Sequence, residues 1–573
     1  MGDCTKGGLS QVPRSAITIL ITLAATIAVA LSCQAADHKW RQLFEMVPMR
    51  DGVRLSTYIW LPEGDGPWPA VVVRTPYGGH GVGSGWQSER LLENGYCLVG
   101  QDMRGRFKSE GKAPAFTADG RGEHKDGYDC VEWVAKQPWC NGKVGTWGAS
   151  APGITQMMMA TYPPPDLTCQ HIGIAAADLY PQTYFQGGQL RLELVLYWLN
   201  KGGWDVQEHL TMGLRHFTYD DFWRQFSLNE PDVRPNAPML NWAGWYDIFS
   251  QGAIDAFIAG KHRGGPKARN DQILIMGPWP HGIAKDFGKA RLPQEALTPP
   301  LIDCLAYFDH YLKGKNNEVA NAKRVHYYTI GDILDPECKL NRWRTADDWP
   351  VSAKHTPLYL HPDGKLSFEK PGRDGGAKSF MYDPKNPVPT LGGNNLFLEK
   401  GPFDNRELEG RPDVLVYTTA PLEKDTEVTG RVKAHLFVSS SCKDTDFTAK
   451  LCDVYPDGAS YNVLDGIIRM LFTDGFTQTR PLEPGRIYPA EIDLWSTSWV
   501  FRKGHRIRVD ISSSNYPRFE ANPNTGEKLS LSVDPSDPVN KKVERRTIRA
   551  RNTVYSDAAH PSCVVLPVVE QGH

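Results

Sequence analysis

One segment, VGTWGASAPG at 144–153, constrains the fold of this chain more than any other. A short apolar run leads to a glycine, then to a serine between small residues, and then to residues that can begin a helix. This order is typical of a nucleophile elbow, a sharp strand-to-helix turn that exposes the serine hydroxyl. Small neighbours permit the tight backbone bend. The segment therefore predicts a strand before Ser150 and a helix after it, with a glycine-rich turn of no catalytic role as the alternative.

The elbow departs from the usual G-x-S-x-G pattern at one position. It reads Gly148-x-Ser150-x-x-Gly153, and Pro152 stands where the second glycine usually falls. Proline is tolerated in the first turn of a helix because its missing N–H would have no intrahelical partner there. The prediction of a helix after Ser150 is therefore unaffected.

Two later segments supply the other groups that a serine nucleophile needs. Serine is a weak nucleophile at its ordinary pKa and needs an adjacent base, which a carboxylate orients in turn. The runs at 241–247 and 273–282 each read as an apolar strand followed by a turn, and the turns present Asp247 and His281. Residues just past the carboxyl ends of parallel strands meet at one edge of a sheet. The order Ser150, Asp247, His281 therefore predicts a triad of the α/β-hydrolase type.

The alternation of runs along the first part of the chain predicts an α/β fold. The β-type runs fall at 53–61, 70–74, 96–102 and 143–147, and the helical runs at 89–94, 126–137 and 304–312. Strands that alternate with helices favour a largely parallel sheet covered on both faces. From about 186 to 236 the chain instead has helical runs rich in aromatic residues.

The last third of the chain has a different pattern. Runs of β-branched residues are broken by Gly, Pro and Asp turns, at 413–419, 427–439, 449–455, 487–494 and 506–512. Many short strands without helices between them predict an all-β sandwich. A separate binding module and a structural support are both consistent with such a domain.

Seven segments in order resemble one group of serine hydrolases, which contains the cocaine esterases, α-amino-acid ester hydrolases and X-prolyl dipeptidyl aminopeptidases. They are MRDGVRL at 49–55, RTPYG at 74–78, QDMRGR at 101–106, the elbow, WYD at 245–247, GPWPH at 277–281 and SSSNYPR at 512–518. The resemblance covers nearly all of the chain after residue 45. It implies a triad of Ser150, His281 and Asp247. It also implies an oxyanion hole formed by the backbone N–H of Ala151 and the phenolic hydroxyl of Tyr77.

The two implied oxyanion donors fit the local pattern. Tyr77 follows the apolar run 71–73 and lies in a Pro-Tyr-Gly-Gly turn, where an exposed aromatic side chain without a role is the alternative. The family often has Tyr directly after the nucleophile, whereas this chain has Ala151. The N–H donor survives that change because it belongs to the backbone. The shape of the acyl pocket beside it does not follow from the resemblance.

The residue patterns and the resemblance together give the expected domains. The N-terminal pattern predicts a signal peptide (1–36), and an α/β-hydrolase domain in two parts (37–185 and 237–352), a helical cap inserted between them (186–236) and a jelly-roll-like β-sandwich (353–573) are expected after it. A cap in this place would shape the acyl pocket and exclude water.

The residues around Asp247 indicate the substrate class. The α-amino-acid ester hydrolases carry acidic residues directly after the triad aspartate, but here Ile248 and Phe249 follow it. Asp178 could supply a single carboxylate, and we also expect Trp147 in the pocket. The expected activity is hydrolysis of carboxylic esters with a neutral, in particular aromatic, acyl group. An α-amino-acyl amidase, peptidase or β-lactam acylase is the alternative; a non-catalytic binding protein is disfavoured because the triad is intact.

Composition excludes other classes and favours an exported chain. A net charge of −2 and the lack of a basic tract argue against nucleic-acid binding. No phosphate-binding loop or metal-ligand spacing is seen, so no cofactor or metal is expected.

A basic start, an apolar run at 16–31 and small residues before Asp37 predict a secretory signal. Lipid attachment at Cys33 and an uncleaved anchor are alternatives. Nine cysteines lie beyond the signal segment, which contains Cys4 and Cys33. Buried free thiols are the default expectation for them, and some could form disulfides in an exported protein. The oligomeric state is left open.

Overall fold

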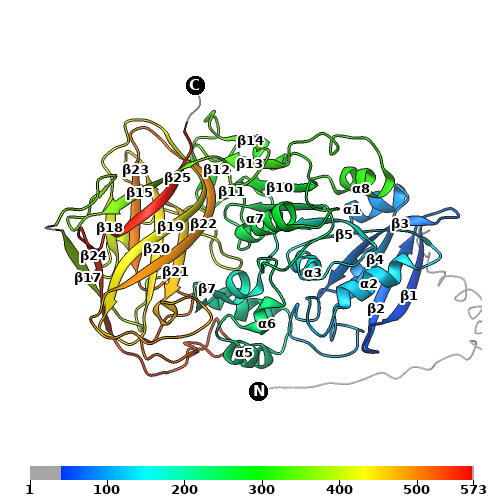
Figure 1. Cartoon of the computed structure of the whole chain (residues 1–573), viewed down its shortest axis with the longest axis horizontal. Coiled ribbons are helices and arrows are strands. Elements are labelled where there is room, and N and C mark those ends of the chain that lie inside the picture. The colour runs from blue at the N-terminus through cyan, green and yellow to red at the C-terminus, as the bar shows by residue number, and fades with distance from the viewer. Residues whose placement is uncertain (1–39, 374, 571–573) are drawn as a thin grey trace, which may run out of the picture.

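The computed structural model describes residues 40–373 and 375–570. The expected signal segment and Cys33 lie outside these residues, so export stays a prediction. An α/β part and an all-β part lie side by side along the longest axis of the molecule (Figure 1). Among the described residues, no helix has both the length and the apolar character needed to cross a membrane.

A ten-stranded sheet forms the centre of the α/β part. In order across the sheet its strands are β1 (Arg41–Pro48), β2 (Arg54–Leu61), β4 (Cys97–Asp102), β3 (Trp68–Thr75), β5 (Cys140–Ala149), β6 (Leu167–Gly173), β9 (Met239–Gly244), β10 (Gln272–Gly277), β13 (Val325–Thr329) and β14 (Arg342–Ala346). Pairing is parallel from β4 to β13 and antiparallel at both edges. The strands predicted from the apolar runs are present, and β1, β6, β13 and β14 are additions to them.

Helices cover both faces of this sheet, because alternate residues of each strand point to opposite faces. Ile273 and Ile275 of β10 belong to one apolar core, and Leu274 and Met276 belong to another. The helices are α1 (Trp86–Glu93) and α8 (Cys304–Lys313) on the first face, and α2 (Asp126–Ala135), α3 (Ala151–Ala160) and α7 (Ser250–Ile258) on the second. This arrangement confirms the predicted parallel sheet with two covered faces.

The cap lies between β6 and β9 and combines short helical turns with a small hairpin. Its elements are η2 (Tyr180–Tyr184), β7 (Phe185–Gln186), β8 (Gln189–Leu190), η3 (Glu193–Tyr197), α4 (Trp198–Lys201), α5 (Val206–Arg215) and α6 (Asp221–Arg224). Its aromatic side chains, among them Phe185 and Trp223, form a core with Met157 and Met158 of α3. The cap is thus fixed to the helix that follows Ser150.

Two sheets form the all-β part. The larger contains, in order, β16 (Leu366–Ser367), β15 (Lys354–Leu360), β25 (Cys563–Val568), β19 (Thr426–Ser440), β24 (Ala550–Ser556) and β17 (Gly376–Tyr382), and β22 (Tyr488–Phe501) also pairs with β19. The smaller contains β18 (Leu415–Thr418), β23 (Arg506–Ser512), β20 (Asp446–Val454) and β21 (Ser460–Arg469). The prediction of an all-β C-terminal domain is confirmed, whereas its jelly-roll connectivity stays a prediction.

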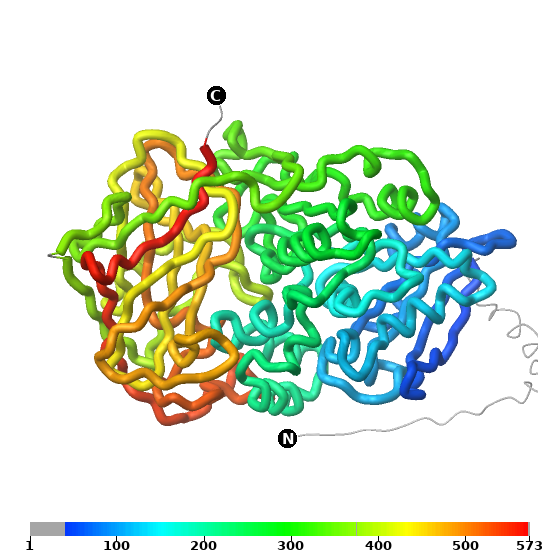
Figure 2. Tube along the Cα trace, viewed as in Figure 1, coloured from blue at the N-terminus to red at the C-terminus, as the bar shows by residue number. Residues whose placement is uncertain are grey.

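The two parts share one apolar core. It contains Leu436 of the larger β-sheet, Leu451 of the smaller one, and Phe257 and Met276 of the α/β part. Figure 2 shows the loops of the β part directly beside the cap and α7. The all-β domain is therefore integrated into the molecule, as expected for a structural support.

The remaining short elements are η1 (Gly79–Gly81), η4 (Ala259–Arg263), β11 (Asp286–Phe287), β12 (Ala290–Arg291), η5 (Gln294–Leu297), α9 (Arg406–Glu409) and η6 (Met470–Phe472). All nine cysteines of the described chain are buried free thiols, as expected.

Candidate active site

Ser150 lies on a strained turn between β5 and α3. Its backbone has φ 60° and ψ −125°, in the left-handed region that a non-glycine residue seldom adopts. A Cβ on Gly148 would lie 2.5 Å from Cβ of Pro152, and one on Gly153 would lie 2.7 Å from the carbonyl oxygen of Gly173. Both glycines are therefore required. Gly153 lies one position after the place of the second glycine in the usual elbow pattern, and it still lets α3 approach the sheet closely.

Hydrogen bonds join Ser150, His281 and Asp247. The Nε2 atom of His281 is 2.9 Å from Oγ of Ser150, and its Nδ1 atom is 2.6 Å from Oδ2 of Asp247. Asp247 is fully buried, and the side chain of His281 is 9% exposed. An ionised carboxylate only accepts, so Nδ1 carries the imidazole proton and Nε2 is free to accept one. The three residues predicted from the sequence thus lie within bonding distance, in the geometry that proton transfer from Ser150 requires.

The backbone around Asp247 is held from two sides. The other carboxylate oxygen, Oδ1, accepts the N–H of Phe249 at 2.6 Å. The side-chain amide of Asn394, from a loop of the β domain, donates to the carbonyl oxygens of Asp247 and Trp245 at 2.8 and 3.0 Å. Sequence reasoning missed Asn394, because only the Gly-Gly-Asn-Asn run at 392–395 marks this loop and no pattern ties it to Asp247. The β domain therefore supports the triad directly.

The two expected oxyanion donors follow neighbouring strands of the sheet, because Tyr77 comes after β3 and Ala151 comes after β5. Ala151 is the first residue of α3, where N–H groups have no intrahelical acceptor. Tyr77 follows β3, and its hydroxyl accepts the indole N–H of Trp198 at 2.9 Å. Asp102 holds the turn after Tyr77, because its carboxylate accepts the N–H of Gly79 and the hydroxyl of Ser56. The N–H of Ala151 and the hydroxyl of Tyr77 stay the proposed donors for an anionic oxygen.

An apolar cavity of about 490 Å³, part of it open to solvent, begins at Ser150 and extends under the cap. It is lined by Ala115, Phe116, Ser150, Ala151, Ile154, Thr183, Tyr184, Leu194, Val195, Trp198, Leu199, Ile248, Phe249 and Leu396. None of these lining residues is charged. Ile248 and Phe249 line it as predicted.

A buried carboxylate ties the cap to the loop that contributes Leu396. Oε1 of Glu193 accepts the backbone N–H groups of Leu396, Phe397 and Leu398. Glu193 is 1% exposed and begins the turn η3, which contributes Leu194 and Val195 to the cavity. Sequence reasoning missed this clamp, since its partners are about 200 residues apart. The cavity wall is therefore assembled from both domains.

Two predicted pocket residues lie elsewhere, which corrects the sequence-based expectation. Trp147 does not line this cavity but lines a second groove with His171, Trp242 and Ile302, which also reaches Gly148, Ala149 and Pro152 of the elbow. Asp178 is 4% exposed, and its carboxylate accepts the hydroxyl of Ser227 at 2.5 Å and the N–H of Tyr180 at 3.0 Å. A carboxylate engaged in this way does not face the cavity. It offers no counter-charge to a substrate ammonium group there.

Burial gives Asp178 a pH-dependent effect on stability. Desolvation raises the pKa of its carboxyl group to about 7, against an ordinary value of 3.8. The folded state therefore keeps a proton that the unfolded state loses, so folding stability falls as pH rises from about 4 to 7. We expect Asp178→Asn, which mimics the protonated acid, to raise the free energy of unfolding by up to about 3 kcal/mol more at pH 8 than at pH 5, because the interval from pH 5 to the folded pKa spans about two pH units. Urea unfolding at both pH values measures this, and an equal effect at both would contradict it.

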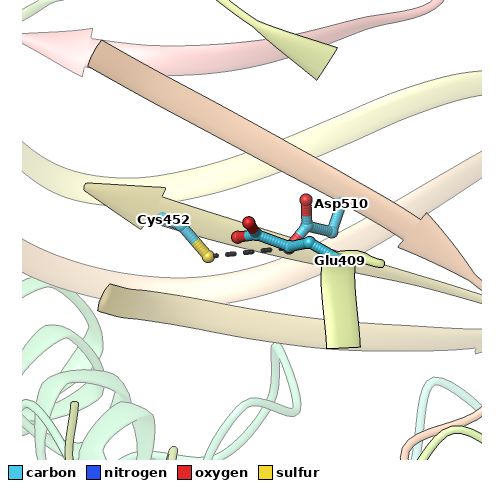
Figure 3. Close-up of side chains that lie close together, drawn as sticks. All are labelled: Glu409, Cys452 and Asp510. Atoms are coloured by element: carbon cyan, nitrogen blue, oxygen red, sulfur yellow. Dashed lines mark hydrogen bonds between the residues drawn. The ribbon is translucent and has the colours of Figure 1, made fainter. Parts of the chain in front are cut away.

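One cluster outside the cavity has the residue types of a metal site. Glu409, Cys452 and Asp510 place ligand atoms within 4.8 Å of one another in the β domain (Figure 3). However, Arg508 pairs with Glu409, and Lys450 lies opposite Asp510 in the β20–β23 ladder. Burial also raises the pKa of the Cys452 thiol well above its ordinary value, which keeps it protonated. Arg508 thus pairs with one of the two carboxylates, and the Cys452 thiol donates to the other at 3.8 Å, so the residues of this cluster have protein partners without a metal.

Known proteins match this chain over nearly all of the described residues. The family model for X-Pro dipeptidyl-peptidase (S15 family) matches residues 51–210 and 205–283, and that for the X-Pro dipeptidyl-peptidase C-terminal non-catalytic domain matches 317–565. Cocaine esterase from Rhodococcus sp. (strain MB1 Bresler) is 34% identical over 92% of this chain and 98% of its own length.

Solved structures agree with these matches. An α-amino acid ester hydrolase is 26% identical, with a TM-score of 0.78, over 97% of this chain and all of its own. An aminopeptidase from the marine sediment archaeon Thaumarchaeota archaeon is 25% identical, with a TM-score of 0.77, over 93% of this chain and 97% of its own. These likenesses confirm the predicted α/β-hydrolase domain followed by an all-β domain. The S15 match includes Ser150, Asp247 and His281.

Proposed function

This chain belongs to the cocaine esterase and X-Pro dipeptidyl-peptidase (S15) family of serine hydrolases, and we propose that it hydrolyses carboxylic esters of neutral, in particular aromatic, acyl groups. The observation that carries this proposal is the apolar, uncharged cavity that opens at Ser150. A neutral acyl group can enter this cavity at no electrostatic cost, because it has no charge to desolvate. An ammonium group would lose its hydration there, and no charged lining residue would compensate for that loss.

In the proposed mechanism Ser150 is the nucleophile. Its hydroxyl proton passes to Nε2 of His281 while Oγ forms a bond to the ester carbon, and the carbonyl oxygen becomes an oxyanion. The N–H of Ala151 and the hydroxyl of Tyr77 donate to this oxygen. Collapse of the intermediate breaks the bond to the alcohol oxygen, which takes the proton from His281 and leaves an acyl group on Ser150.

Water then completes the reaction by the same route. His281 accepts a proton from water as the water oxygen bonds to the acyl carbon, and it returns that proton to Oγ of Ser150 when the acid leaves. Asp247 keeps the imidazole in the tautomer with a proton on Nδ1 and stabilises the imidazolium that forms twice in each cycle. The cap limits entry of bulk water to the cavity.

The acyl preference follows from the missing counter-charge. At pH 6, where an α-amino group stays charged, we expect kcat/KM for a p-nitrophenyl phenylacetyl ester to exceed that for its D-phenylglycyl analogue by about 100-fold or more. The two esters have acyl groups of similar shape and differ mainly in the ammonium group. Initial rates on purified protein measure the ratio.

A preference for the phenylglycyl ester would contradict the neutral-acyl assignment and favour an α-amino-acyl hydrolase or peptidase. Ser150→Ala, which removes the nucleophile, serves as the control for background hydrolysis of both esters.

Export is also part of the proposal, supported by the residue pattern at 1–36. N-terminal sequencing of protein recovered from outside the cytoplasm tests it.

A further inference from the structure

The hydroxyl of Tyr77 has one recorded partner, and that partner comes from the cap. Nε1 of Trp198 lies 2.9 Å from Oη of Tyr77, although the two residues are 121 positions apart in the sequence. The Tyr77 side chain is 53% exposed, so packing alone does not fix where its hydroxyl points. The bond from Trp198 therefore supplies orientation that the surroundings of the ring do not.

The chemistry of the two groups fixes the direction of this hydrogen bond. An indole N–H is a donor only, so the phenolic oxygen must accept. The phenolic proton is consequently left for another acceptor. Desolvation raises the pKa of Tyr77, which keeps that proton in place at neutral pH. When an ester carbonyl lies at Ser150, its oxygen becomes the acceptor of this phenolic proton in the proposed oxyanion hole.

The indole of Trp198 stacks on two aromatic rings. The ring of Phe116 lies with its centroid 5.6 Å from that of the indole, and the ring of Trp204 lies with its centroid 5.7 Å away. The guanidinium of Arg106 lies over the ring of Trp204, 4.4 Å from its centroid. A stacked indole has little freedom to rotate, so its N–H has a fixed direction.

Arg106 also connects this stack to the turn that carries Tyr77. It donates to the carbonyl oxygen of Pro76 at 3.4 Å and to that of Gly202, in the cap, at 2.6 Å. The turn before Tyr77 and the cap segment after Trp198 are thus held by one side chain. Arg106 thus helps to fix the distance between the indole N–H of Trp198 and the hydroxyl of Tyr77.

We propose that Trp198 is a positioning residue for catalysis: its indole N–H holds the hydroxyl of Tyr77 so that the phenolic proton points at the carbonyl oxygen of the substrate. This inference rests on the proposed function. It assigns the cap a part in transition-state stabilisation, in addition to the wall that Trp198 contributes to the cavity.

Trp198→Phe tests the inference because it keeps an aromatic ring in the stack and the cavity wall but removes the donor. We expect kcat for p-nitrophenyl acetate to fall about 10-fold or more, with KM changed less than threefold, since a misdirected donor weakens the transition state and not ground-state binding. Acetate is used because its small acyl group depends least on the cavity wall. Trp204→Phe is the matched control, because it also removes an indole N–H from this stack, and that N–H has no hydrogen-bond partner. The loss of kcat in this control should be clearly smaller.

A double-mutant cycle with Tyr77→Phe separates positioning from packing. If Trp198 acts through the Tyr77 hydroxyl, adding Trp198→Phe to Tyr77→Phe causes no further loss of kcat. An equal loss in both backgrounds, or a loss confined to KM, would overturn the inference. Failure of the proposed function is distinguished without Trp198 variants: the parent protein would prefer the phenylglycyl ester, or Ser150→Ala would stay active. Thermal unfolding of each variant shows whether it is folded.

Discussion

Ser150→Ala is expected to reduce kcat for ester hydrolysis by about 10⁶-fold, to the level that binding and the oxyanion donors support without a nucleophile. His281 then has no hydroxyl to deprotonate, and no acyl-enzyme forms. The side chain of Ser150 makes no capping hydrogen bond to α3, so the substitution should leave the unfolding temperature nearly unchanged. Steady-state rates with p-nitrophenyl esters, together with a thermal melt, measure both effects.

One outcome for this variant would contradict the assignment of Ser150 as nucleophile. Residual activity within about 10-fold of the parent protein would show that another group is the nucleophile. Loss of activity together with loss of folding would leave the serine's chemical role unproven by this variant; inhibitor labelling of the parent protein, described below, decides that case.

Asp247→Asn is expected to lower kcat by about 10⁴-fold, the second-largest effect. The N–H of Phe249 donates to Oδ1 of Asp247, so an asparagine would turn its oxygen to Phe249 and its NH₂ group to Nδ1 of His281. The imidazole proton would then move to Nε2, which could no longer accept the proton of Ser150. The substitution keeps the shape of the site but imposes the wrong tautomer.

The β domain offers a matched control for this change. Asp453 is buried and lies 2.9 Å from Nδ1 of His505, an Asp–His pair that the proposed mechanism does not use. Asp453→Asn should lower stability without a comparable loss of kcat in the folded fraction. Similar losses of kcat in both variants would argue that the effect of Asp247→Asn comes from general disruption. Active-site titration of each sample gives the folded, competent fraction.

Local patterns were sufficient to predict the elbow and the three residues that it brings together. Ser150, Asp247 and His281 each follow a run that forms a strand of one parallel sheet, and strand ends in such a sheet converge. Other local signals were the alternation of strands with helices, which predicted the α/β sheet, and the turn composition, which predicted the all-β domain. These signals lie within a few residues of the element that they predict.

The residues that support the site could not be predicted, because they come from distant parts of the chain. Asn394, Glu193 and Trp198 act through partners more than 100 positions away. Side-chain direction was a second source of error. Gly145 lies against Phe308 of α8, and Trp147, two residues later on the same strand, must face that side and not the cavity.

The central claim is that Ser150 attacks a neutral acyl group in the apolar cavity. An activated phosphonate ester that carries a benzyl group tests it most directly, because its tetrahedral phosphorus mimics the intermediate and its benzyl group matches phenylacetyl. After inactivation, peptide mass spectrometry locates the adduct. The account predicts one adduct per chain, on Ser150, with activity lost in proportion. An adduct on another residue, or full activity in the labelled protein, would contradict it.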